Sequence, residues 1–310
     1  MKIKRLSFLL ALVMILSAFA GTFTISAEGE ETAVNAWEVN GATYATFQEA
    51  IDAAVAGDTI YLVADYTQTG DVDIRKDLTI EGRTKADGTP PVFTHVPTWD
   101  IISIGDMDDP DAACTVVFKN FNFTTVNLKQ SGSIYVRKDC SLTMENMNII
   151  YGVGTKPHYV TKGLIRVYST NNDVTLRNCN ITVPEEMNTP INPGLISIDR
   201  DPAKDNTIMI DGCTIDFSMA ACPVYILQVA NAAAAANNTF VIRESTIKTP
   251  DSVDYPFAQG DLVHNGTGTQ FKNQVEFTGT IDYRGTNTVN GKTTTNADID
   301  YLIYDSQARE

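Results

Sequence analysis

A motif that recurs along the chain places the strongest constraint on the fold. Most copies alternate apolar and polar residues, reach a charged residue followed by Asn or Gly, and continue into a second apolar alternation. Full copies begin at Val116, Leu142, Val174, Ile208 and Phe240, and partial copies begin at Leu78 and Val275. The copies start 26 to 38 residues apart, and another short apolar segment follows most of them. Repeats of this length indicate a solenoid or a related array.

The composition of each copy indicates how it folds. Asn and Gly tolerate the left-handed backbone that a sharp bend between two strands requires. Each unit therefore contains a strand, a bend, a second strand, a loop and a third strand. One unit cannot bury its apolar face alone, so successive units must stack and pair in parallel, about 4.8 Å apart. The sequence predicts an all-β fold, a parallel β-helix of about seven coils.

A helical period precedes the repeat. Phe47, Ala50, Ile51 and Ala54 share one helix face, and Thr46 and Glu49 have the spacing of a capping box. We expect a short N-terminal capping helix at about residues 46–57.

The first residues have the pattern of a secretory signal peptide. Basic residues precede the apolar run Leu6–Phe19, which small residues follow. This run is shorter than the roughly 20 apolar residues of a membrane span. We expect residues 1–27 to be a signal peptide and 28–310 to be a single β-helix domain that is secreted or held at the cell surface, with no membrane span. The net charge of −15 argues against a nucleic-acid partner.

Three segments together resemble the start of pectin-lyase-like right-handed β-helix proteins. They are Thr46–Ala54, Gly57–Ile60 and Leu78–Gly82. The resemblance covers most of residues 28–310 and implies right-handed coils. That superfamily includes lyases, hydrolases, adhesins and proteins without known activity, so the resemblance implies a fold more than a function.

Alignment of the copies predicts columns of stacked residues. One bend stacks Asn120, Asn146 and Asn178, which predicts an asparagine ladder. The inward residues beside it are Phe121, Met147, Cys179, Cys213 and Ser245. The charged position alternates in sign from coil to coil, which favours a structural pairing role. Its members are Glu81, Lys119, Glu145, Arg177, Asp211 and Arg243.

The chain has five cysteines. Cys179 and Cys213 share one inward position in adjacent coils, and Cys114 and Cys140 share another. The Cα spacing of stacked strands suits a disulfide, but parallel Cβ vectors give poor torsion angles. We expect buried free thiols. There is no CxxC motif and there are only three histidines, so no zinc site is expected.

If the resemblance extends to polysaccharide lyases, it implies a catalytic base that lies beside calcium ligands. The third strand of each coil points one column of side chains outward: Ser103, Tyr135, Arg166 and Ser197. Arg166 as base with Asp199 and Asp201 as calcium ligands is one hypothesis. A solvated strand face is the alternative, and we assign no catalytic residue. The Trp-Ile-Asp-His motif of pectate lyases and the Asn-Thr-Asp and Gly-His-Gly elements of polygalacturonases are absent.

A loop rich in aspartate is a second candidate for calcium. Asp106, Asp108, Asp109 and Asp111 match part of a calcium loop, without the Gly and the closing Glu of an EF-hand. We therefore predict no cofactor, with weak calcium binding as the alternative to a solvated loop.

The loops 150–163, 182–194 and 248–260 are expected to emerge at one corner of the coils. Their aromatic and polar residues suit a sugar or a surface partner. The candidate binding residues are Tyr151, His158, Tyr159, Glu185 and Tyr255. The sequence thus favours noncatalytic binding of a polysaccharide or of a cell-surface glycan or protein. The alternatives are a divergent polysaccharide lyase or glycoside hydrolase acting on acidic glycans, and a purely structural or adhesin-like module.

Overall fold

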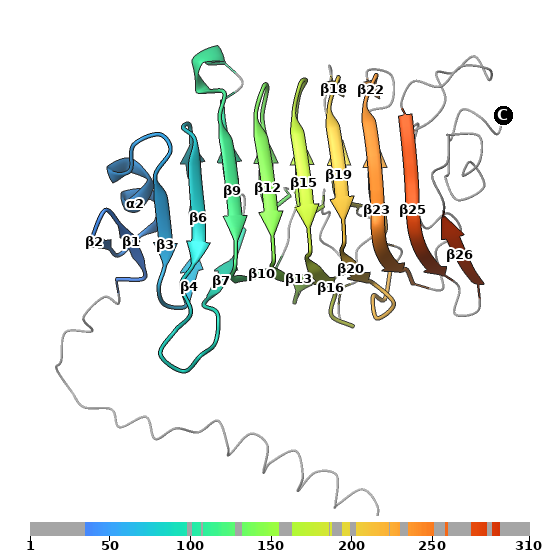
Figure 1. Cartoon of the computed structure of the whole chain (residues 1–310), viewed down its shortest axis with the longest axis horizontal. Helices are drawn as coiled ribbons and strands as arrows, with labels where there is room; N and C mark the ends of the chain where they lie inside the picture. The colour runs from blue at the N-terminus through green and yellow to red at the C-terminus, as the bar shows by residue number, and fades with distance from the viewer. Residues whose placement is uncertain are drawn as a thin grey trace, which may run out of the picture. The chain divides into compact units, whose positions relative to one another are not determined.

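The computed structural model describes much of the chain from Asn35 onward. The described residues are 35–97, 101–106, 108–127, 132–154, 163–185, 187, 194–198, 203–222, 224–229, 235–250, 258–259, 274–283 and 287–291. The predicted signal peptide, residues 1–27, lies outside them. The fold is all-β, as predicted, and consists mostly of parallel strands that stack side by side as in a β-helix (Figure 1).

The largest sheet has 17 strands and contains two parallel rows. The first row is β3 (Thr59–Leu62), β6 (Leu78–Gly82), β9 (Thr115–Lys119), β12 (Ser141–Glu145), β15 (Asp173–Arg177), β19 (Thr207–Asp211), β23 (Thr239–Lys248) and β25 (Gln274–Tyr283). The second row is β4 (Tyr66–Gln68), β7 (Val92–His95), β10 (Asn122–Val126), β13 (Asn148–Val153), β16 (Asn180–Thr182) and β20 (Thr214–Asp216), and it continues in the second halves of β23 and β25.

A separate sheet of seven strands carries the third strand of each unit. It consists of β5 (Val72–Ile74), β8 (Ile102–Ile104), β11 (Ile134–Val136), β14 (Ile165–Val167), β17 (Gly194–Ile198), β21 (Tyr225–Val229) and β24 (Ala258–Gln259). The short strands β18 (Ala203–Lys204) and β22 (Ala235–Ala236) form a third sheet.

The register predicted from the repeat is confirmed. The first residues of the motif copies are successive partners in one parallel ladder: Leu78, Val116, Leu142, Val174, Ile208, Phe240 and Val275. Alternate residues in each strand are buried, because successive side chains point to opposite faces. Stacking therefore buries the same position of every copy in one continuous core.

The bends after the first row adopt the predicted left-handed conformation. Asn120, Asn146 and Asn178 have φ of 64°, 53° and 50°, and Gly212 and Glu244 occupy the same position with φ of 62° and 48°. The residue after each bend is buried, as predicted for Phe121, Met147, Cys179, Cys213 and Ser245.

The asparagine ladder, however, lies at a different bend from the predicted one. Asn146 is exposed, and the Asn120 amide donates to Glu81 Oε1 (3.1 Å). The ladder is instead buried, where Asn172 Nδ2 donates to Asn206 Oδ1 (3.0 Å) and Asn206 Nδ2 to Asn238 Oδ1 (2.8 Å). The predicted asparagines have left-handed backbone themselves, and their side chains face solvent. The asparagines of the buried ladder instead come directly after left-handed residues, and their side chains point inward.

The inward side chains of both bends also satisfy buried backbone donors. Asn206 Oδ1 accepts from the N–H of Asn172 (2.9 Å), and Asn238 Oδ1 accepts from the N–H of Asn206 (3.0 Å). At the other bend Ser245 Oγ accepts from the N–H of Cys213 (3.1 Å). A buried N–H without an acceptor is costly, so Asn206, Asn238 and Ser245 stabilise the fold by supplying one.

All five cysteines are free and buried, which confirms the expected thiols. The hydrogen bond between Cys114 and Cys140, together with burial, raises the pKa of Cys114. The hydrogen bond to Cys213, together with burial, likewise raises the pKa of Cys179. The reactive thiolate form is thus disfavoured at both positions.

The charged column of alternating sign is confirmed in register. Glu145 pairs with Arg177, and Arg177 pairs with Asp211 along the ladder. Lys119 Nζ lies 3.1 Å from Glu81 Oε2, and Arg177 Nε lies 3.9 Å from Asp211 Oδ2. The side chains are partly exposed, so each pair stabilises the fold by no more than about 1 kcal/mol.

The N-terminal elements precede this stack. Helix α2 (Phe47–Ala53) has the predicted capping box between Thr46 and Glu49, but it ends earlier than predicted because Ala54 is extended. A hairpin of β1 (Trp37–Val39) and β2 (Ala42–Tyr44) comes before it, and β1 pairs antiparallel with β3. The buried Trp37 ring stacks on Phe47 at 4.3 Å between ring centroids. At the other end of the described chain, β26 (Asn287–Gly291) pairs antiparallel with β25.

Candidate functional site

The predicted outward column lies on the seven-stranded sheet in the expected register. Asp73, Ser103, Tyr135, Arg166 and Ser197 are successive partners in β5, β8, β11, β14 and β17. The prediction that Ser103, Tyr135, Arg166 and Ser197 share one column is confirmed. Ser103, Tyr135 and Ser197 are buried, with 4%, 7% and 0% of their surface exposed, whereas Arg166 is partly exposed and Asp73 is exposed.

Two tyrosines and two arginines from adjacent coils form one cluster on this face. We call Tyr135, Arg137, Arg166 and Tyr168 the arginine–tyrosine cluster. The two tyrosine rings stack at 5.3 Å. The guanidinium carbon of Arg166 lies 4.9 and 4.6 Å from the centroids of Tyr135 and Tyr168, and that of Arg137 lies 5.3 and 5.2 Å from them. Arg166 Nη1 also donates to the Tyr135 hydroxyl.

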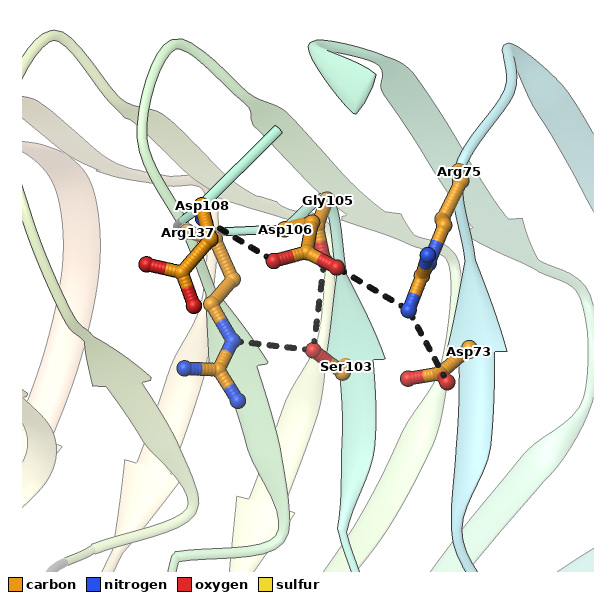
Figure 2. A pocket seen from close by; sticks show the side chains of 7 residues that line it. All are labelled: Asp73, Arg75, Ser103, Gly105, Asp106, Asp108 and Arg137. Atoms are coloured by element: carbon orange, nitrogen blue, oxygen red, sulfur yellow. Dashed lines mark hydrogen bonds and ion pairs between the residues drawn. The ribbon is translucent and has the colours of Figure 1, made fainter. Parts of the chain in front are cut away.

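A cleft of about 270 Å³ adjoins this cluster (Figure 2). Its lining residues are Asp73, Arg75, Ser103, Gly105, Asp106, Asp108 and Arg137. Arg75, Gly105 and Arg137 each follow corresponding strands in three successive coils. Gly105 thus lies between two arginines in this column.

Gly105 cannot be replaced without strain. Its φ is 79°, and a Cβ on it would lie 2.3 Å from Cys140 Sγ and 3.3 Å from the carbonyl oxygen of Ala112. Real Cβ atoms do not approach other atoms so closely, and other residues seldom adopt this backbone conformation. The glycine therefore lets the buried Cys140 thiol pack directly behind the floor of the cleft.

Most polar groups of the cleft have partners (Figure 2). Arg75 Nη2 lies 3.0 Å from Asp106 Oδ2 and 3.5 Å from Asp73 Oδ2. Arg137 Nε donates to Ser103 Oγ (2.9 Å), which in turn donates to the carbonyl oxygen of Gly105 (3.3 Å). Asp106 Oδ1 accepts from the N–H of Asp108 (3.0 Å).

Two charged groups of the cleft remain available. Among the described residues, neither the Nη atoms of Arg137 nor the carboxylate of Asp108 has a hydrogen-bond or ion-pair partner. Arg137 is held in place through its Nε and through the tyrosine rings, so its terminal N–H groups are positioned to donate. The cleft thus offers one free donor group and one free acceptor group.

Of the three predicted catalytic candidates, only Arg166 lies among the described residues. Arg166 packs against the two tyrosine rings, an arrangement that holds a cation well. The role of Arg166 as a base stays a prediction. Asp199 and Asp201 lie outside the described residues, so their role as calcium ligands stays a prediction.

The predicted binding edge receives one correction. Tyr151 is fully buried in β13, so the prediction that its ring lies on an exposed edge is wrong. The alternation of β13 turns Ile149 and Tyr151 inward and leaves Ile150 at 42% exposure. Glu185 lies exposed in a turn, and its role stays a prediction. His158, Tyr159 and Tyr255 lie outside the described residues.

Two carboxylates of the aspartate-rich loop contact nearby groups of the protein. Asp106 contacts Arg75, and Asp109 caps the short 3-10 helix Pro110–Ala112 by accepting from the N–H of Asp111 (3.0 Å). In the described part of the chain, no three His, Cys, Asp or Glu side chains are grouped to hold a metal ion. Over the same residues, no helix is long and apolar enough to cross a membrane.

Sequence reasoning missed Arg137, Tyr168 and Gly105. Each follows a third strand by one position, outside the motif that defines the repeat. The register of the seven-stranded sheet is the signal that finds them, because it places these positions in one column. Comparisons with protein-family models, with curated proteins and with solved structures found no match to the chain.

Proposed function

We propose that this is a secreted or cell-surface β-helix protein that binds carbohydrate or a surface partner without catalysis. The binding face is the outer face of the seven-stranded sheet. One observation carries the proposal: the arginine–tyrosine cluster and the cleft lie next to each other on that face, joined by Arg137.

The chemistry of these groups supports a sugar ligand. Aromatic rings pack against the apolar C–H faces of sugars, while arginine and carboxylate groups bond to hydroxyls. Parallel strands hold the side chains in a fixed array, so little ordering free energy is lost when a ligand binds. Function on such scaffolds usually resides in residues carried by a rigid repeat.

The finer architecture is also part of the proposal. We propose right-handed coils, about seven in number, of the pectin-lyase-like type, with α2 covering the N-terminal end of the core. The capping box, the burial of Phe47, Ala50 and Ile51, and the matched register of the motif copies support this arrangement.

A glycan array followed by titration tests the proposal. The double variant Arg137→Ala/Tyr168→Ala should bind the selected ligand at least about tenfold more weakly, because each such contact is worth about 0.5–2 kcal/mol. The variant also loses contacts within the protein, so its melting temperature should be lower and binding is measured well below it.

The matched control removes another arginine and tyrosine that contact each other, on the large sheet. Arg83 lies 4.2 Å from the Tyr61 ring centroid on the large sheet, so Arg83→Ala/Tyr61→Ala should leave binding unchanged. An array without any ligand, or equal loss in both double variants, would contradict the proposal. Release of unsaturated uronic products from acidic polysaccharides would favour the lyase alternative, with Arg166, Asp199 and Asp201 as its candidates.

A further inference from the structure

We infer that the cleft beside Gly105 binds an uncharged, hydroxyl-rich sugar unit, so that the ligand is a neutral glycan rather than an acidic one. This inference rests on the proposed function and specifies its ligand class. It is argued from the charges, the free hydrogen-bonding groups and the size of the cleft.

The charges of the cleft disfavour an anion. Three carboxylates, from Asp73, Asp106 and Asp108, face two guanidinium groups. Arg75 is already held by Asp73 and Asp106, so Arg137 is the single cation left for a ligand among the lining residues. An anionic group that reached Arg137 would also meet the Asp108 carboxylate. The net charge of the chain, −15, adds a long-range repulsion.

The free groups of the cleft match neighbouring hydroxyls. Figure 2 shows Asp108 and Arg137 together on one side of the cleft, across from Arg75. The terminal N–H groups of Arg137 only donate, and the carboxylate of Asp108 only accepts. A sugar hydroxyl does both, since its proton bonds to a carboxylate while its oxygen accepts from a guanidinium. Charge-assisted hydrogen bonds of this kind are stronger than neutral ones.

The size of the cleft suits one sugar unit. Its volume of about 270 Å³ lies just below the range of roughly 300–1,000 Å³ that is typical of sites for drug-sized ligands. Tyr168 is half-buried and packs against Arg137, which also lines the cleft, so the exposed part of its side chain lies within the reach of a longer sugar chain. A neutral oligosaccharide would therefore occupy the cleft with one unit and the cluster with its neighbour.

Calorimetric titration with oligosaccharides of equal length tests the inference. The probes are neutral β-glucan, mannan and galactan oligosaccharides and an acidic oligogalacturonate. We expect a neutral probe to bind and Asp108→Asn to weaken it about five- to tenfold, because a charge-assisted acceptor is lost. Arg137→Met should weaken the same probe at least as much.

The control is Asp111→Asn, which removes an exposed carboxylate from the same segment but does not line the cleft. It should leave the affinity unchanged, which separates a local contact from the change in net charge. Asp108→Asn and Asp111→Asn should keep the parent melting temperature, since both side chains are exposed, whereas Arg137→Met loses the hydrogen bond from Nε to Ser103 and should melt lower.

The remaining outcomes are distinguishable. Preferential binding of the oligogalacturonate, tightened by Asp108→Asn, would overturn the inference but leave carbohydrate binding intact. If a neutral probe binds but neither Asp108→Asn nor Arg137→Met changes its affinity, the probe does not bind in the cleft and the inference is overturned. If no oligosaccharide binds at all, the carbohydrate proposal itself falls.

Discussion

At the scale of single residues, the two bends of each coil follow one rule. A residue with left-handed backbone precedes an inward residue, as Asn171 precedes Asn172 and Asn178 precedes Cys179. Where that inward residue is Asn, Cys or Ser, its side chain can accept from a buried N–H of the preceding coil, as Asn206, Cys213 and Ser245 do. Asn, Cys and Ser recur at these positions because each can accept such a bond, whereas an aliphatic residue cannot.

The rule predicts unequal costs for two asparagine substitutions. Asn206→Leu removes the oxygen that accepts from both the backbone N–H and the side-chain amide of Asn172. This substitution should therefore lower the free energy of unfolding by about 2–4 kcal/mol. Asn146→Leu, at an exposed left-handed position, should cost only about 1–2 kcal/mol. Urea unfolding measures both. Equal losses would show that the buried ladder adds nothing beyond backbone conformation.

At the scale of elements, the ends of the large sheet differ from its interior. β1 runs antiparallel to β3, and β26 runs antiparallel to β25, whereas the strands between pair in parallel. An unpaired strand at the end of a parallel stack would offer a template for a second chain. In the described part of the chain, these antiparallel strands occupy that template at both ends of the first strand row.

Removing the N-terminal hairpin should therefore create association. Deletion of residues 35–44 exposes the edge of β3, and sedimentation velocity should show dimers or larger species that grow with concentration. Trp37→Ala is the control, because it removes the buried ring and lowers stability while it keeps the β1–β3 pairing. A deletion variant that stays monomeric would contradict this role of β1.

At the scale of the whole molecule, the five thiols report on the integrity of the core. All of them are buried, and they are spread from Cys114 to Cys222 across successive coils. A thiol reacts as an exposed thiolate, so a folded core should protect every one of them.

Reaction with Ellman's reagent measures this protection. The native protein should react only as fast as it unfolds, and full reactivity should appear in strong guanidinium chloride. Met219 is 56% exposed, so Met219→Cys should add one thiol that reacts at once and serves as the positive control. Rapid labelling of any native cysteine would mean that the coils open locally rather than together.

The sequence alone determined the stack and its register. The spacing of apolar residues within each copy specifies which side chains point inward, and identical positions must pair when copies stack. That reasoning predicted the parallel all-β fold, the alternating charges, the buried free thiols and the column of Ser103, Tyr135, Arg166 and Ser197. These features depend on periodicity, which is a local property of the chain.

The tertiary structure alone decided where a site forms. Periodicity could not show that β13 runs on to Val153 and so keeps Tyr151 facing the core, or that the buried ladder begins at Asn172. The cleft needs Arg75, Gly105 and Arg137 to lie side by side, although they are separated by whole coils of variable length. Loop lengths absorb that variation, so the column appears only when the third strands pair. A binding site is a set of distances between remote side chains, and packing determines those distances.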